Sequence, residues 1–215
     1  MRKFLFIAAI ALLGTVGLSA CNDSGEGQTA TTQAKATRPT EAAVDEAVKA
    51  CRAKHPKAAA PASAGSAPAS GQSAAPSLEG GSSEEEDVCA RATVAYQTWQ
   101  PYLQQVVTDN MEGITNNPYM YFVPSSKYPE NQGYIGRIQD QINSVVAATV
   151  LPGNMIAAGG PDSATTAQVL ENGFKQASPG SFKGVVVLFI GDKADEAAVK
   201  AAVDPSGATL KFAQM

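Results

Sequence analysis

The chain has 215 residues, 44% of them hydrophobic, and its 16 basic and 20 acidic side chains give a formal net charge of −4 at pH 7. This length is sufficient for one domain with a hydrophobic core. The negative charge argues against nucleic acid and anionic lipid headgroups as partners, because both require a basic surface.

Residues 1–20 have the composition of an export signal. Arg2 and Lys3 form a short basic start, residues 4–16 are apolar, and small residues follow. The apolar stretch of 13 residues is shorter than the roughly 20 that a membrane-spanning helix needs, and no later segment comes closer. We therefore predict a signal peptide that is cleaved, and no integral membrane span. Its removal leaves 14 basic and 20 acidic side chains, a net charge of −6.

The end of this signal carries a motif, Leu18-Ser19-Ala20-Cys21, with an aliphatic residue, two small residues and a cysteine. It resembles the lipobox of bacterial lipoproteins, in which the cysteine receives a diacylglyceryl group and the chain is cut just before it. The resemblance covers the first 21 residues and implies a protein held on the cell membrane or outer membrane by acyl chains on Cys21. Each buried methylene contributes about 0.8 kcal/mol, so two or three chains suffice. The alternative is an ordinary secretory signal that ends near a cysteine.

Two segments of low complexity follow. Residues 21–39 consist mainly of Gly, Thr, Ser, Gln and Ala, and residues 57–83 mainly of Ala, Pro, Ser and Gly. Such segments bury too little apolar surface to fold, so we predict a flexible tether and a disordered insertion. Between them, residues 40–56 place apolar side chains at helical spacing, with Thr40 as the N-cap and His55-Pro56 as the stop.

A second helix is predicted after the insertion, at the start of an α/β domain over residues 84–215. Ser83-Glu84-Glu85-Glu86 matches a capping box, where a helix dipole favours acidic residues. The expected apolar face comprises Val88, Ala92, Tyr96, Trp99, Leu103 and Val106.

Two cysteines remain beyond the lipobox, and in an oxidising compartment the simplest interpretation pairs Cys51 with Cys89. The bridge would close a loop of 38 residues, which contributes about 4 kcal/mol on the chain-entropy model. It would link the two predicted helices across the insertion. The alternatives are two free thiols or one reactive thiol.

After Gly113 the pattern alternates between strands and helices. The apolar run at 184–190 is continuous, as expected of a strand covered on both faces, so it should be central. Helices between strands favour right-handed crossovers and a parallel sheet. We predict a small three-layer α/β fold with a mainly parallel four-stranded sheet and flanking helices, preceded by the disulfide-linked helical pair. The predicted strands are 119–123, 154–158, 184–190 and 209–213, and the helices are 133–149, 163–177 and 194–203.

Familiar catalytic motifs are missing from the sequence. His55 is the single histidine, and it lies at a helix end, whereas Ser- or Cys-based hydrolases need an imidazole beside the nucleophile. No zinc-ligand spacing and no glycine-rich phosphate loop is present. We expect no cofactor and no metal.

Three loops at the carboxyl ends of the predicted strands are the best candidates for a ligand site, because open α/β sheets bind ligands there. Gly159-Gly160 before a helix could expose N–H groups to an anion. Adjacent crossovers on opposite faces of the sheet would leave a crevice between them. The alternative is that Asp162 or Ser163 simply caps the helix. The candidate rim comprises Ser125, Ser126, Lys127, Gly160, Asp162, Ser163, Asp192 and Lys193.

These features favour a membrane-anchored, extracytoplasmic binding or interaction module that reaches an envelope protein or a cell-wall partner. One alternative is a small envelope enzyme that uses carboxylates and Lys127 without histidine. Another is a purely structural envelope protein. A concave site that joins the three loops would favour a ligand or catalysis, and a flat apolar patch would favour a protein partner.

Overall fold

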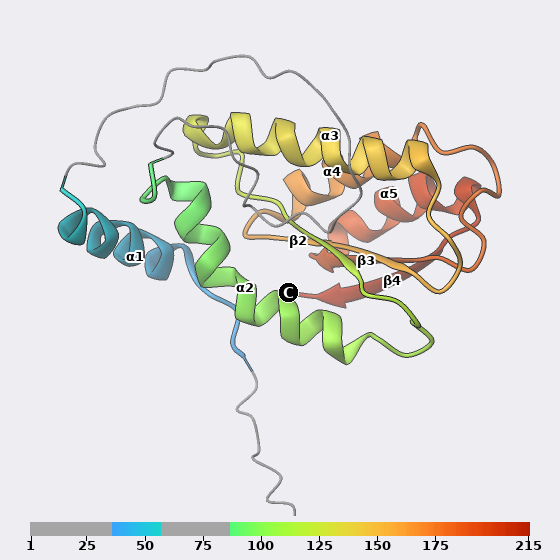
Figure 1. Ribbon diagram of the computed structural model, residues 1–215, viewed down its shortest axis with the longest axis horizontal. Coiled ribbons are helices and arrows are strands. Elements are labelled where there is room, and N and C mark those ends of the chain that lie inside the picture. Colours follow the sequence, from blue (N-terminus) through green and yellow to red (C-terminus); the bar gives the residue numbers. More distant parts are fainter. Residues whose placement is uncertain (1–35, 57–86) are drawn as a thin grey trace, which may run out of the picture. The chain divides into compact units, whose positions relative to one another are not determined.

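The structure is a computed structural model, and it describes residues 36–56 and 87–215 (Figure 1). The predicted signal peptide, the lipobox with Cys21, nearly all of the tether, the insertion and the capping-box residues lie outside this part of the chain. Within it, no helix is long and apolar enough to cross a membrane.

The sheet has four parallel strands in the order β1-β2-β3-β4. The predicted α/β fold is therefore confirmed, and the strand expected to be central lies inside the sheet. Each strand is joined to the next by a helix, which brings the second strand back in the same direction. The strands are β1 (Tyr119–Phe122), β2 (Met155–Gly159), β3 (Val186–Gly191) and β4 (Thr209–Gln214). The connecting helices are α3 (Gln132–Ala148), α4 (Ser163–Phe174) and α5 (Lys193–Val203).

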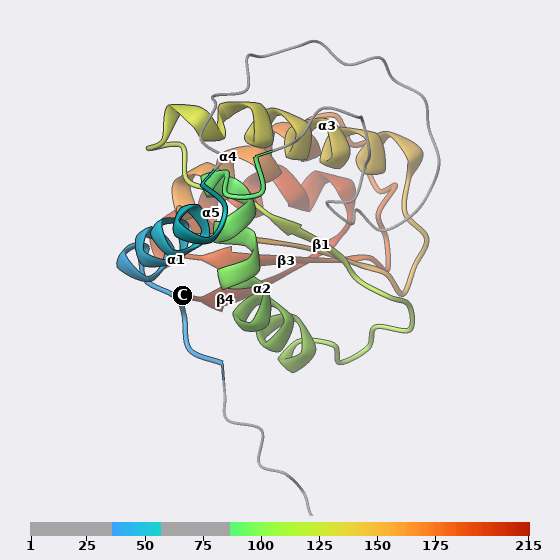
Figure 2. The same cartoon turned by 60° about the vertical axis from the view of Figure 1, so that its left-hand side comes forward.

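Two hydrophobic clusters occupy the two faces of the sheet. Tyr121, Ile156 and Phe189 belong to the cluster that contains the buried residues of α3, α4 and α5. The other cluster contains Ala157 and Leu188 together with buried residues of two further helices, α1 (Glu41–Lys54) and α2 (Arg91–Asp109). Figure 2 shows the resulting three layers: α3, α4 and α5, then the sheet, then α1 and α2. The expectation that adjacent crossover helices lie on opposite faces is wrong, because the strand order never reverses and all three lie on one face.

The start of α1 follows its prediction. The Thr40 side chain accepts a hydrogen bond from the Ala43 N–H at 3.2 Å, and the buried residues of the helix are Val44 and Val48. This satisfies one of the N–H groups that a helix N-terminus leaves without a partner.

The start of α2 differs from its prediction. The helix begins at Arg91, because Asp87 closes a turn before it: the Asp87 carbonyl accepts from the Ala90 N–H at 2.6 Å, and its carboxylate accepts from the Cys89 N–H at 3.0 Å. Val88 is consequently 53% exposed and does not belong to the apolar face. Farther along, Trp99 and Leu103 are buried as expected.

The turn before α2 carries one end of the disulfide. Cys51 of α1 is bonded to Cys89, with their Cα atoms 5.6 Å apart. This separation is ordinary for a disulfide. The predicted pairing, and the linkage of the two helices, are confirmed.

Candidate functional site

The carboxyl ends of the parallel strands bring the three predicted loops to one edge of the sheet. The centre of this edge is Asp162, the N-cap of α4. Its carboxylate accepts hydrogen bonds from the hydroxyls of Thr165 at 2.8 Å, Ser125 at 3.2 Å and Ser126 at 3.3 Å, and from the Thr165 N–H at 3.3 Å. The loop after β1 and the loop after β2 are thus joined through one carboxylate.

Asp162 is also electrostatically tuned by these partners. Burial acts to raise the pKa of its carboxyl group, but the hydrogen bonds from Thr165, Ser125 and Ser126 outweigh burial and leave the pKa below its usual value. Hydrogen bonds to the charged form are the reason, since they stabilise the carboxylate. The group is an ionised acceptor with its donors already in place, which fits capping better than proton transfer.

A second polar group joins α4 to the loop after β3. The Ser163 hydroxyl lies 2.5 Å from an Asp195 carboxylate oxygen and accepts from the Asp192 N–H at 2.7 Å. The predicted rim residues Ser163 and Asp192 therefore meet, and Asp195 of α5 is a partner that sequence reasoning missed. Asp195 lies near the start of the helix predicted at 194–203, and nothing in the sequence indicated its contact with Ser163.

The two rim lysines pair with different helices. The Lys127 ammonium lies 3.3 Å from the Glu41 carboxylate of α1, and the Lys193 ammonium pairs with Glu196 one turn along α5. Both lysine side chains are exposed. Their positive charge is therefore compensated locally.

Gly160 has a packing role at this edge. A Cβ atom at this position would lie 1.9 Å from the Val123 carbonyl oxygen, so no other residue fits against the end of β1. Glycine is used where backbone segments approach closely. This accounts for Gly160 without an anion. Asp162 caps the helix, as the alternative interpretation of the segment held.

A small cavity borders the rim on the side of the helical pair. It measures about 10 Å³ and is lined by residues of α1, α2 and the loops after β1 and β2, including Glu41, Arg91, Ser125, Tyr128 and Asn131. This volume is roughly that of a single water molecule. It is too small for a metabolite, and its position does not join the three loops in one concave site.

Arg91 organises the region around that cavity. Its guanidinium is 2.6 Å from the Asp45 carboxylate of α1 and lies 3.5 Å from the centre of the Tyr128 ring. Arg91 thus fastens both helices of the pair to the loop after β1. Sequence reasoning missed it because the three residues are distant along the chain and follow no recognised spacing.

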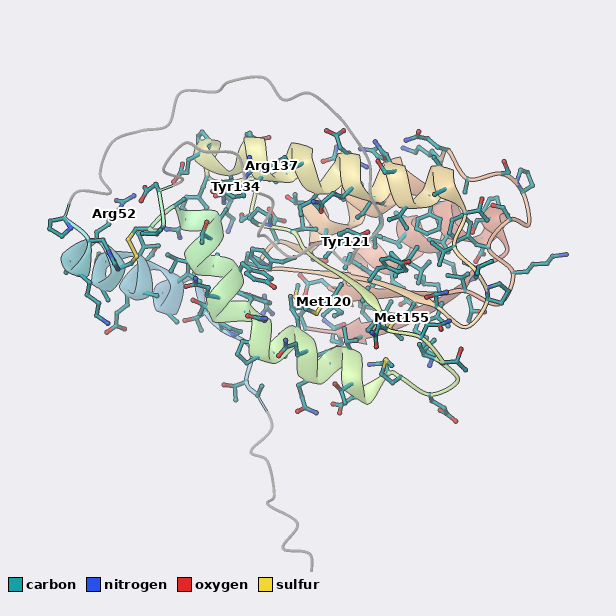
Figure 3. The ribbon with its side chains drawn as sticks, in the orientation of Figure 1. Arg52, Met120, Tyr121, Tyr134, Arg137 and Met155 are labelled. Carbon is teal, nitrogen blue, oxygen red and sulfur yellow. A yellow bond between two sulfur atoms is a disulfide. The ribbon has the colours of Figure 1, made fainter. Side chains whose placement is uncertain are left out.

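The side chains of Figure 3 form a packed interior in which Tyr121 and Met155, both labelled there, are almost inaccessible to solvent. Over residues 36–56 and 87–215, no cluster of three His, Cys, Asp or Glu residues could hold a metal ion. His55 forms the C-cap of α1 and is exposed. The hydroxyls of Ser125 and Ser126 contact the Asp162 carboxylate, and the hydroxyl of Ser163 contacts the Asp195 carboxylate.

The fold and the site define an α/β domain whose polar rim is tied together by its own capping and loop contacts. No protein-family model, curated protein or solved structure matches the chain.

Proposed function

We propose that the protein is a bacterial lipoprotein, anchored through Cys21, whose α/β domain acts as a binding or interaction module in the cell envelope. The observation that carries the anchor is the motif Leu18-Ser19-Ala20-Cys21 directly behind a basic start and an apolar stretch. A disulfide between Cys51 and Cys89 is in keeping with export, since disulfides persist in oxidising compartments.

The state of the rim supports binding over catalysis. A catalytic nucleophile needs a base able to take its proton, but the Asp162 carboxylate to which Ser125 and Ser126 donate has a lowered pKa and is therefore a weak base. Lys127, the centre of the enzyme alternative, is exposed and paired with Glu41. An exposed lysine whose ammonium is paired with a carboxylate is a weak catalyst, because activation of a lysine requires burial or a neighbouring cation.

The proposed partner is an envelope protein or the cell wall, reached by a tether of about 19 residues. A net charge of −6 after removal of the signal disfavours nucleic acid, which attracts basic proteins.

The anchor is tested by replacing Cys21 with Ser in cells fed a labelled fatty acid. We expect the label on the wild-type protein and none on Cys21→Ser, which should also leave the membrane fraction or retain its signal peptide. Ser19→Ala is the matched control, because it keeps a small residue in the motif and should remain labelled. A wild-type protein without acyl mass, released from membranes by salt, would exclude the anchor.

The binding role is tested on cell-wall material and by crosslinking in cells. The purified protein is mixed with cell-wall sacculi, and cells are treated with a protein crosslinker before the protein is recovered. Retention on sacculi or one reproducible crosslinked partner supports an interaction module. Turnover of envelope substrates that disappears on Lys127→Ala would instead support the enzyme alternative.

A further inference from the structure

The outer edge of β4 carries backbone groups without partners in the described part of the chain. The Thr209 N–H donates to Val185 and the Met215 N–H donates to Gly191, so the odd-numbered residues of β4 bond to β3. In a parallel pair the intervening residues direct their N–H and C=O groups away. These residues are Leu210, Phe212 and Gln214, and no backbone hydrogen bond to another described residue reaches them from the outer side.

This edge lacks the usual devices that prevent association. Proteins protect edge strands by making them short, by proline, by bulges and by outward lysines. β4 pairs without interruption over six residues, and its one charge, Lys211, turns its ammonium to the carbonyls of Asn110 and Glu112 at 3.0 and 3.1 Å. The opposite edge is protected, because β1 has four residues and lies between Pro118 and Pro124.

A charged stripe lies beside this edge on α5 and its C-cap, Asp204. Lys193, Glu196, Lys200 and Asp204 follow one another at three- and four-residue spacing and therefore share one side of the helix. The Lys193 ammonium lies 5.3 Å from the centre of the Phe212 ring, which places the stripe toward β4. Asp195, by contrast, bonds to Ser163 on the α4 side.

The four charges of the stripe alternate in sign, so the stripe read from its last residue to its first has the opposite charge at each position. Within one copy Lys193 pairs with Glu196 and Lys200 pairs with Asp204. When two copies of the stripe run antiparallel, Lys193 also faces Asp204 and Glu196 also faces Lys200 of the other copy. Complementary charges set the register and orientation of an association. A second copy of this chain therefore fits this surface better than a partner of uniform charge.

We propose that two copies of the protein associate through antiparallel pairing of their β4 strands, around a two-fold axis at Phe212. In this register Leu210 faces Gln214 of the second copy, and each outward N–H of the three edge residues meets a partner carbonyl. Phe212 faces its own counterpart, and Lys211 faces Ala213, which keeps the two lysines apart. Such an interface uses the same patch on both copies. This inference concerns the folded domain and does not depend on the membrane anchor or its partner.

The first test is crosslinking in cells that produce the full chain. With a short bis-maleimide, Phe212→Cys should give a covalent dimer, because residue 212 lies at the axis. Thr209→Cys is the matched control, since it would be separated from its counterpart by roughly 20 Å, or six residues along paired strands. Equal crosslinking at both positions, or none at either, would overturn the proposal.

The second test leaves the packed residue Phe212 unchanged. Gln214 is exposed, and Gln214→Pro removes an outward N–H while placing a ring on the edge. Gln214→Ala keeps that N–H and is the control. We expect sedimentation of the purified full chain to show self-association, unchanged in Gln214→Ala and about tenfold or more weaker in Gln214→Pro. A monomeric wild-type chain, or equal association of all three proteins, would contradict the proposal.

Discussion

The two faces of the sheet are covered in different ways. On one face, α3, α4 and α5 are the connections between consecutive strands, so the chain itself delivers them to the sheet. On the other face, α1 and α2 precede all the strands, and residues 57–86 separate α1 from the turn before α2. The first layer follows from connectivity, whereas α1 must be held by specific contacts.

Those contacts are few and can be named. Val44 and Val48 bury their side chains, Asp45 pairs with Arg91, Glu41 pairs with Lys127, and Cys51 is bonded to Cys89. We therefore expect the sheet and its three connecting helices to unfold as one cooperative unit, and α1 to be the element most easily released.

The largest expected effect lies in the core layer. Phe189 is fully buried on the α5 side of the central strand, with its ring 5.9 Å from that of Phe212. Phe189→Ala should reduce the free energy of unfolding by about 3–5 kcal/mol, because the cavity cannot collapse fully. Denaturant unfolding measures this loss. Val88→Ala, at an exposed apolar position, is the control and should change stability by less than about 0.5 kcal/mol; similar losses for both would mean that the burial pattern is wrong.

The next effect separates the two layers. Replacing Cys51 and Cys89 together with Ala should cost about 2–4 kcal/mol, since the bridge restricts the unfolded chain. Hydrogen exchange should then accelerate in α1 while the amides of β3 stay protected, because α1 loses its covalent link and the sheet does not. Reduction of the wild-type protein should reproduce this result. Equal acceleration in α1 and β3 would show instead that the two layers unfold as one.

A smaller effect is expected at the rim, where Asp162→Ala removes a helix cap and should cost about 0.5–2 kcal/mol near neutral pH. The folded-state pKa of Asp162 is lowered, so its stabilisation is complete above the unfolded-state pKa and is lost as the pH falls through the folded-state value. The difference between Asp162→Ala and wild type should therefore shrink below about pH 4.

Asp192→Ala is the matched control for this prediction. Asp192 is the N-cap of α5, but its side chain makes no capping hydrogen bond. Its replacement should cost less and show a weaker pH dependence. Thermal melts of both variants from neutral to acid pH provide the measurement, and a constant cost for Asp162→Ala over that range would argue against the lowered pKa.

The sequence was sufficient to predict the elements that depend on local pattern. Apolar periodicity predicted the four strands and the helices between them, and Thr40 predicted the start of α1. The pairing of Cys51 with Cys89 followed from their number and the expected compartment. These features depend on residues close in sequence or on a choice with few alternatives.

The features that were missed depend on contacts between distant segments. α2 begins at Arg91, later than predicted, because Asp87 closes a turn next to the disulfide. The faces that the crossover helices cover were predicted wrongly, because they depend on strand order, which periodicity does not contain. Arg91 and Tyr128 lie far apart along the chain and are brought together by the tertiary fold.

The smallest expected effect on stability comes from the two rim lysines, and it bears most directly on binding. Lys127 and Lys193 form exposed ion pairs, each worth about 0–1 kcal/mol. Replacing both with Ala should therefore leave the fold intact. If the rim accepts an anion, titration of the wild-type protein with inorganic phosphate should shift the amide resonances of residues 160–163, since a helix N-terminus favours negative charge. The double variant should lose this response.

The outcome of that titration distinguishes two candidate binding surfaces. No shift in the wild-type protein, or equal shifts in the double variant, would mean that the two lysines do not bind the anion, and would favour the surface of the helical pair. Trp99 is only 1% exposed, so on that surface the half-buried Tyr96 and Tyr102 are aromatic side chains that a partner can reach, and Tyr96 is the one to change first. Tyr96→Ala would then be expected to weaken capture of the crosslinked partner, while Gln97→Ala, at an exposed neighbouring position, would not.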